Sequence, residues 1–122
     1  MILVDTSVWI DHHRGTAPHL TDLLNQNLVA THPGIIGELA CGFLADRQAF
    51  LHLLRGLPQV SEASHDEALF FIEVHRVFGK GAGYIDIHLM TAAVINGVRF
   101  WTRDKRLVQI ASHLNIAYSA LP

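Results

Sequence analysis

The chain opens Met1-Ile2-Leu3-Val4-Asp5-Thr6-Ser7-Val8-Trp9-Ile10-Asp11, and this opening is its most informative segment. A short apolar run rich in branched residues is typical of a strand buried inside a parallel sheet. The run ends in one carboxylate, Asp5, and a helical pattern follows for which we predict Ser7 as the N-cap. We therefore expect Asp5 at the carboxyl end of a strand, where open α/β sheets bind their ligands.

Strand and helix patterns alternate along the rest of the chain. Strands are predicted at residues 2–4, 28–31, 98–102 and 116–118, with another short one near Val60. Helices are predicted over residues 7–13, 18–26, 33–44, 46–57, 65–78, 84–96 and 104–113. Strands separated by helices predict an α/β fold, with a mostly parallel central sheet of about five short strands and helices on both faces.

Composition limits the class of protein. The 122 residues predict one domain, residues 1–122, and half of them are apolar, which is typical of a globular protein. No apolar run reaches the roughly 20 residues of a membrane span, and the opening lacks the basic leader of a signal peptide. The single cysteine is consistent with a reducing cytoplasm. The net charge of −2 predicts no overall basic field, so any nucleic-acid contact would be local.

Four of the eleven acidic residues lie in unusually apolar surroundings. Asp5 and Asp104 each follow a predicted strand, whereas Glu38 and Asp86 lie within apolar helices. Each also has a structural interpretation: the three aspartates as helix caps or first-turn acids, and Glu38 as a solvent-facing residue. Those interpretations do not explain why two strand ends and two apolar helices each carry one acid. We expect the four to converge on one crevice.

Such a cluster predicts metal chemistry. Carboxylates that lie close together repel each other unless cations or protons neutralise them. A purely carboxylate set, without a partnering histidine or cysteine, favours Mg²⁺ or Mn²⁺ over zinc. One or two such ions activate water and stabilise the leaving oxygen when a phosphodiester is cleaved.

At these residues the sequence resembles PIN-domain ribonucleases, and specifically the VapC toxins of bacterial VapBC toxin–antitoxin pairs. The resemblance spans essentially the whole chain and rests on the opening segment, Glu38, the Asp86 helix with its Thr-Ala-Ala, and Trp101-Thr102-Arg103-Asp104. It implies a PIN domain with Mg²⁺- or Mn²⁺-dependent endoribonuclease activity on tRNA or rRNA, which blocks translation. It also implies a homodimer and neutralisation by a VapB-type antitoxin that wraps the toxin. We expect the antitoxin to bind over a landing zone, that is, an interface formed by the apolar helices at residues 33–57 together with the acidic crevice.

The resemblance also implies roles for individual residues. The catalytic and metal-binding acids would be Asp5, Glu38, Asp86 and Asp104, with Asp5 and Asp86 as the direct ligands. Supporting hydroxyls would come from Thr6, Ser7 and Thr102. One position departs from the family pattern, because many relatives carry an acid two places after the last Asp, where this chain has Arg106. That departure puts a second metal position in doubt.

Several basic residues flank the acids and are candidates for contacts with RNA phosphates: Arg14, Lys80, Arg103, Lys105 and Arg106. Ordinary surface charge balance explains any one of them equally well.

Two other functional classes place an acid after the first strand. Haloacid-dehalogenase-type phosphatases need a second Asp two residues later, where this chain has Ser7, and receivers need an acidic pair before the strand-end Asp. Neither pattern is present. The alternative that stays open is a catalytically silent PIN-like module that binds RNA or a protein partner, for which loss of metal binding would be the sign.

Overall fold

The computed structural model describes residues 1–119, so residues 120–122 of the predicted domain lie outside the described part. Its centre is a parallel sheet of β1 (Ile2–Val4), β2 (Val29–Ala30) and β3 (Arg99–Trp101), in the order β2-β1-β3. The middle strand is fully buried, as its apolar run predicts. The predicted α/β class with a parallel sheet is therefore confirmed.

The prediction of about five strands is wrong for the two outer segments, because within residues 1–119 each is reduced to a single bridge. Gln59 pairs with Thr31 on one side of the sheet, and Ala117 pairs with Phe100 on the other. On the first side, pairing is limited because Pro58 has no N–H to donate. The sheet thus has three strands, with one bridged residue beyond each edge.

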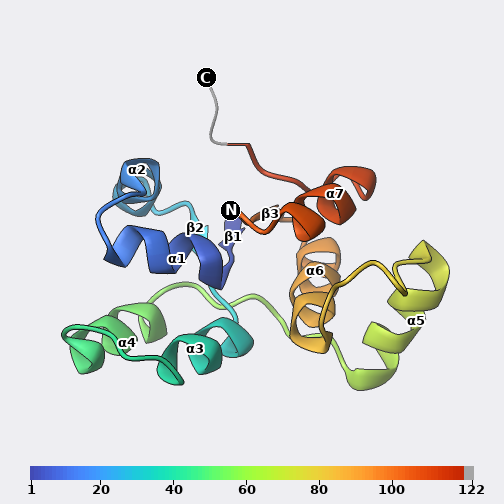
Figure 1. Ribbon diagram of the computed structural model, residues 1–122, viewed down its shortest axis with the longest axis horizontal. Helices are drawn as coiled ribbons and strands as arrows, with labels where there is room; N and C mark the ends of the chain where they lie inside the picture. The colour runs from blue at the N-terminus through green and yellow to red at the C-terminus, as the bar shows by residue number, and fades with distance from the viewer. Residues whose placement is uncertain (120–122) are drawn as a thin grey trace.

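Seven helices are described, and Figure 1 shows them arranged around the sheet. They are α1 (Thr6–His13), α2 (Pro18–Asn25), α3 (Pro33–Ala40), α4 (Arg47–Arg55), α5 (His65–His75), α6 (Tyr84–Asn96) and α7 (Lys105–His113). Helix α3 contacts α1, α4 and α6, and α5 packs against α6. This arrangement brings the first turn of α1 near both α3 and the turn that follows β3.

Several helix boundaries differ from the prediction, and three of the differences have a visible structural cause. Helix α1 begins at Thr6 with Asp5 in the N-cap position, because the Ser7 hydroxyl is bonded to Asp5 instead of capping the helix. Helix α3 ends at Ala40, not at residue 44, and the Arg47 side chain donates to the Ala40 carbonyl at 2.8 Å. Helix α5 ends at His75, before residue 78, because Arg76 adopts a left-handed conformation with φ of 54°.

The buried apolar side chains form one cluster around the sheet, with Trp9 and Phe100 among its largest members. Two of the few polar residues inside it, Asp5 and Thr102, lie at the ends of neighbouring strands. Among the described residues, no helix has the length and apolar character needed to cross a membrane.

Candidate active site

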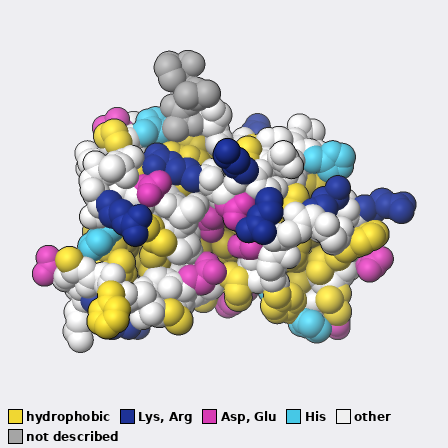
Figure 2. Space-filling model, viewed as in Figure 1, with side chains coloured by type: hydrophobic (Ala, Val, Ile, Leu, Met, Phe, Trp, Pro, Cys, Tyr) yellow, Lys and Arg dark blue, Asp and Glu magenta, His cyan; other side chains and the backbone are white. Residues whose placement is uncertain are grey.

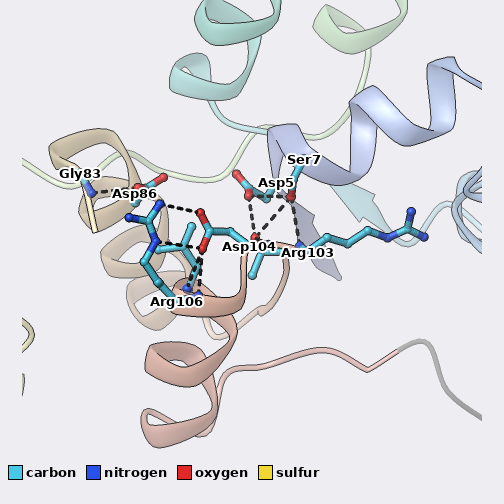
Figure 3. A network of polar contacts seen from close by, with 9 residues as sticks. Asp5, Ser7, Gly83, Asp86, Arg103, Asp104 and Arg106 are labelled. Carbon is cyan, nitrogen blue, oxygen red and sulfur yellow. Dashed lines mark hydrogen bonds and ion pairs between the residues drawn. The ribbon is translucent and has the colours of Figure 1, made fainter. Parts of the chain in front are cut away.

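The register of the sheet places Asp5 beside Thr102. Val4 of β1 lies opposite Trp101 of β3, and the Asp5 N–H donates to the Trp101 carbonyl at 2.8 Å. The Thr102 hydroxyl donates to Asp5 Oδ2 at 2.7 Å, and the Ser7 hydroxyl donates to the same oxygen at 3.0 Å (Figure 3). Asp5 is only 5% exposed, so these two donors offset the cost of burying its charge.

The same two hydroxyls also fix the turn that carries Asp104. Ser7 Oγ accepts from the Arg103 N–H at 3.0 Å, and Thr102 Oγ1 accepts from the Asp104 N–H at 3.2 Å. Each hydroxyl therefore joins the buried carboxylate of Asp5 to the backbone between β3 and α7. The structure thus places Ser7 and Thr102 where they orient Asp5.

Glu38 reaches the crevice from the exposed side of α3. The hydroxyl of Thr6, the first residue of α1, donates to Glu38 Oε1 at 2.8 Å. Burial raises the pKa of Glu38 above its ordinary value, and the charges of Asp5 and Asp86 raise it further, against the opposing effect of the Thr6 bond. The third predicted hydroxyl, Thr6, therefore supports Glu38 and not Asp5.

Asp86 lies in the first turn of α6, where the Gly83 N–H donates to its Oδ2 at 2.9 Å (Figure 3). Burial raises its pKa, which the Gly83 bond opposes, and the charges of Asp5 and Asp104 raise it further. Since the charge of Asp5 acts on both Glu38 and Asp86, and that of Asp104 acts on Asp86, the structure places the four predicted acids near one another, around the space that we call the crevice. The first-turn interpretation of Asp86 also holds, and the two interpretations are compatible.

Asp104 is the N-cap of α7. Its Oδ1 accepts from the Arg106 N–H at 2.9 Å and from the Leu107 N–H at 3.4 Å. The Arg106 guanidinium lies 3.3 Å from Oδ2, and its hydrogen bonds hold the pKa of Asp104 below the ordinary value. The structural interpretation as a cap is therefore right for Asp104, which also borders the crevice.

The four acids do not form a preassembled coordination sphere. Across residues 1–119, no three His, Cys, Asp or Glu side chains are positioned to contact one metal ion. Hydrogen bonds to Thr6, Gly83 and Arg106 hold three of the carboxylates in place (Glu38, Asp86 and Asp104, respectively). The donor set nevertheless fits Mg²⁺ or Mn²⁺, since it is made of carboxylate oxygens whose mutual repulsion a divalent cation would relieve.

The basic residues around the crevice have different surroundings. Figure 2 shows acidic side chains near the middle of one face, with Lys and Arg side chains around them. Arg103 is paired with Asp11 at 2.6 Å, and its guanidinium lies 5.9 Å from the centre of the Trp101 ring. Lys80 and Arg106 line one hollow of about 330 Å³. Lys105 begins α7, and Arg14 follows the end of α1, both with exposed side chains.

Two contacts at this site were not predicted from the sequence. Arg103 and Asp11 are separated by 92 residues, so no local pattern indicates that they pair. The Gly83 N–H that holds Asp86 belongs to the glycine-rich segment 79–83, which lies between two predicted helices and has no helix or strand pattern of its own. Glycine enrichment just before a helix bearing a candidate ligand is the signal that pointed there.

Comparison with known proteins identifies the family. Ribonuclease VapC32 of Mycobacterium tuberculosis strain H37Rv is 42% identical to the chain over 118 residues, which cover 96% of this chain and 95% of that protein. The chain belongs to the VapC ribonuclease family. The protein of the same name from strain CDC 1551 / Oshkosh matches to the same extent, and no family profile matches the chain. The predicted membership among VapC ribonuclease toxins is therefore confirmed.

Proposed function

We propose that this VapC ribonuclease is a Mg²⁺- or Mn²⁺-dependent endoribonuclease toxin that cleaves structured RNA, such as tRNA or rRNA, and thereby blocks translation. The observation that carries this proposal is the crevice itself. Burial raises the pKa of both Glu38 and Asp86, and the charge of Asp5 raises both further, so these carboxylates lie close enough to repel one another. A divalent cation would balance that charge.

Three carboxylates have an oxygen to offer to such an ion. Among residues 1–119, no hydrogen bond engages Asp5 Oδ1, Glu38 Oε2 or Asp86 Oδ1, whereas the other oxygen of each is bonded. The bonded oxygens fix the orientation of each carboxylate, and the open ones supply the hard ligands that Mg²⁺ and Mn²⁺ prefer. We assign Asp5, Glu38 and Asp86 as the residues that hold the ion.

The reaction would be hydrolysis of a phosphodiester bond. A divalent ion in the crevice supplies Lewis acidity toward the phosphate and the attacking water. The water oxygen bonds to phosphorus, the ester P–O bond breaks, and the proton taken from the water ends on the leaving ribose oxygen. Glu38 and Asp86 would lie beside the attacking water, so either carboxylate would be placed to take up its proton.

The RNA would approach over the basic residues beside the crevice. Lys80 and Arg106 share one hollow, and Arg14 and Lys105 are exposed, so their cationic groups are available to phosphates. Arg103 is paired with Asp11 at 2.6 Å, more closely than Arg106 with Asp104 at 3.3 Å, and we expect it to contribute less to RNA binding than the other four.

The proposed protein partner is a VapB-type antitoxin. The predicted landing zone at residues 33–57 includes the fully exposed Phe43 and one wall of a hollow of about 320 Å³ between α1 and α4. Trp9, Phe50 and Leu53 give this hollow an apolar lining. Exposed apolar groups of this kind are typical of protein interfaces and support the assignment.

We further propose a homodimer in the cytoplasm. Exposed apolar side chains on α5 and α6 include Phe70, Val74 and Ile95, and a hollow of about 500 Å³ lies between the two helices. An apolar surface separate from the antitoxin zone supports a second interface. The single cysteine supports a reducing compartment.

Cleavage of total RNA by purified protein tests the function. We compare the wild type with Asp5→Asn and Asp86→Asn, each of which removes one charge with little change of shape. The matched control is Asp66→Asn, since Asp66 also lies in the first turn of a helix but is exposed on α5. Both crevice variants should lose at least about 100-fold in rate, the scale on which removing one electrostatic group acts.

The outcomes separate the proposal from its alternative. Discrete fragments that require Mg²⁺ or Mn²⁺, are retained by Asp66→Asn and are lost in both crevice variants would support the proposal, and end-mapping would identify the cut site. Absence of both cleavage and metal binding would contradict it and favour the catalytically silent module. Cleavage that survives both crevice substitutions would show that these acids are not the site.

A further inference from the structure

We propose that the guanidinium of Arg106 takes the place of a second divalent cation in the crevice, so that each chain binds one metal ion. This inference rests on the proposed metal-dependent function and deepens it by assigning the second positive charge to the protein itself. Four observations lead to it: the contacts of Asp104, the oxygens of the other acids that accept no hydrogen bond within residues 1–119, the position of the Arg106 side chain, and the charge balance.

The first observation is that Asp104 is fully engaged by Arg106 and the start of α7. Oδ1 accepts the Arg106 and Leu107 backbone N–H groups and lies 3.5 Å from Arg106 Nε, while Oδ2 lies 3.3 Å from Arg106 Nη2. Both oxygens of Asp104 therefore face donors of α7. A metal ion bound through Asp104 would have to displace the guanidinium.

The second observation is the contrast with the other three acids. Asp5, Glu38 and Asp86 each have one bonded oxygen and one without a hydrogen bond within residues 1–119. If these three side chains close on one ion, their open oxygens would be enough for one Mg²⁺ or Mn²⁺ that keeps several waters. The acids thus divide into a set of three for the ion and one, Asp104, that holds Arg106.

The third observation is that the neighbouring residues leave a defined space for the Arg106 side chain. Figure 3 shows its guanidinium between the carboxylates of Asp86 and Asp104. On the other side, a Cβ placed on Gly81 would lie 2.8 Å from Arg106 Cδ, so a side chain at this position would shift Arg106. Gly81 also has a φ of +87°, which glycine adopts without strain. The segment before α6 therefore leaves room for Arg106 beside the crevice.

The fourth observation is the charge balance. Of the two ion pairs in the described part of the chain, one joins Arg106 to a crevice acid and the other joins Arg103 to Asp11, outside it. One divalent ion and one guanidinium nearly balance four carboxylates. Two divalent ions together with the guanidinium would exceed that charge and place Arg106 against a dication. A planar guanidinium is also a strong partner for phosphate oxygens, the role that a second metal serves elsewhere.

Counting bound Mn²⁺ tests the inference without relying on activity. Mn²⁺ stoichiometry is measured by electron paramagnetic resonance and equilibrium dialysis for the wild type, Arg106→Gln and Arg106→Lys. The control is Lys105→Gln, which removes the same charge one residue away. Arg106 is 65% exposed in its side chain, and its backbone N–H bond to Asp104 is kept in every variant, so we expect all to fold; circular dichroism checks this.

The wild type, Arg106→Lys and Lys105→Gln should each bind one Mn²⁺ per chain. Arg106→Gln should bind a second Mn²⁺, with an affinity at least about tenfold higher than that of any second, weak binding to the wild type. Two ions in the wild type, or one ion in Arg106→Gln at every concentration, would overturn the inference and leave the proposed function standing. No binding by any variant would overturn the proposed function, and the inference with it.

Discussion

Replacing Thr102 by valine tests how the buried charge of Asp5 is held. Valine keeps the shape of threonine but removes the hydroxyl that donates to Asp5 Oδ2 at 2.7 Å. Both residues are buried, with exposures of 7% and 5%, so water cannot replace the lost donor. A hydrogen bond to a charged group contributes about 1.5–3 kcal/mol. The Asp104 N–H also loses its 3.2 Å acceptor, which places the expected cost toward the upper end of that range.

The chain contains a matched control for this substitution. Thr91 is 3% exposed, and its hydroxyl donates at 2.7 Å to the Ile87 carbonyl, a neutral acceptor within helix α6. Thr91→Val should cost about 1 kcal/mol, the typical net contribution of a neutral hydrogen bond. The difference between the two variants therefore isolates the charge of Asp5, and we expect it to be about 1–2 kcal/mol.

Urea unfolding at pH 7 in the presence of EDTA measures both variants. The buried Trp9 and Trp101 report the transition by fluorescence, and circular dichroism checks that the helices unfold with it. In a thermal melt, the cost expected for Thr102→Val should lower the Tm of a domain of this size by roughly 6–12 °C. A cost for Thr102→Val no larger than that for Thr91→Val would refute the reasoning, because the Thr102 hydroxyl would then stabilise the fold no more than a hydroxyl bonded to a neutral acceptor.

The remaining predictions concern the pH dependence of stability and the position of the Arg106 side chain. Since Glu38 and Asp86 have raised pKa values in the folded state, these two groups bind more protons in the metal-free fold than in the unfolded chain, and their contribution to stability should fall as pH rises above their ordinary values of 4.5 and 3.8. Urea unfolding in EDTA at pH 5 and pH 7 should show a smaller fall for Glu38→Gln/Asp86→Asn than for the wild type; equal falls would contradict this. Gly81→Ala and Gly79→Ala both place alanine at positive φ and should each cost about 1–2 kcal/mol, but only Gly81→Ala meets Arg106. Gly81→Ala alone should therefore shift Arg106 and raise the pKa of Asp104 in a carbon-13 NMR titration. A similar rise in Gly79→Ala would show that Gly81 has no specific role in positioning Arg106.

The elements with strong local signals could be predicted from the sequence. Helix α6 spans Tyr84–Asn96 as predicted and ends at Gly97, which has a φ of 65°. The start of α5 follows the Ser64 capping box, and β1 matches its apolar run. These features depend on neighbouring residues, so their physics is visible within a few positions. The two outer strands depended on pairing across the sheet edge, and there the prediction was wrong.

The candidate site divides in the same way. The four acids could be selected from the sequence because carboxylates in apolar surroundings are unusual whatever the fold. The partners of the basic residues could not be selected, since Arg103 was a candidate for binding RNA and is instead paired with Asp11. Whether a charged side chain contacts RNA, an acid or water depends on which surfaces the fold brings together.

By itself, the sequence determined the α/β alternation, the four candidate acids and the VapC resemblance, because each depends on residue type and order. The tertiary structure alone decided that Val4 lies opposite Trp101, so that Thr102, 97 residues away in the chain, holds Asp5. It also decided that the Arg106 guanidinium lies near Asp86 of α6. The physical reason is that register and side-chain pairing are set by backbone hydrogen bonds and packing between distant segments, which no local pattern encodes.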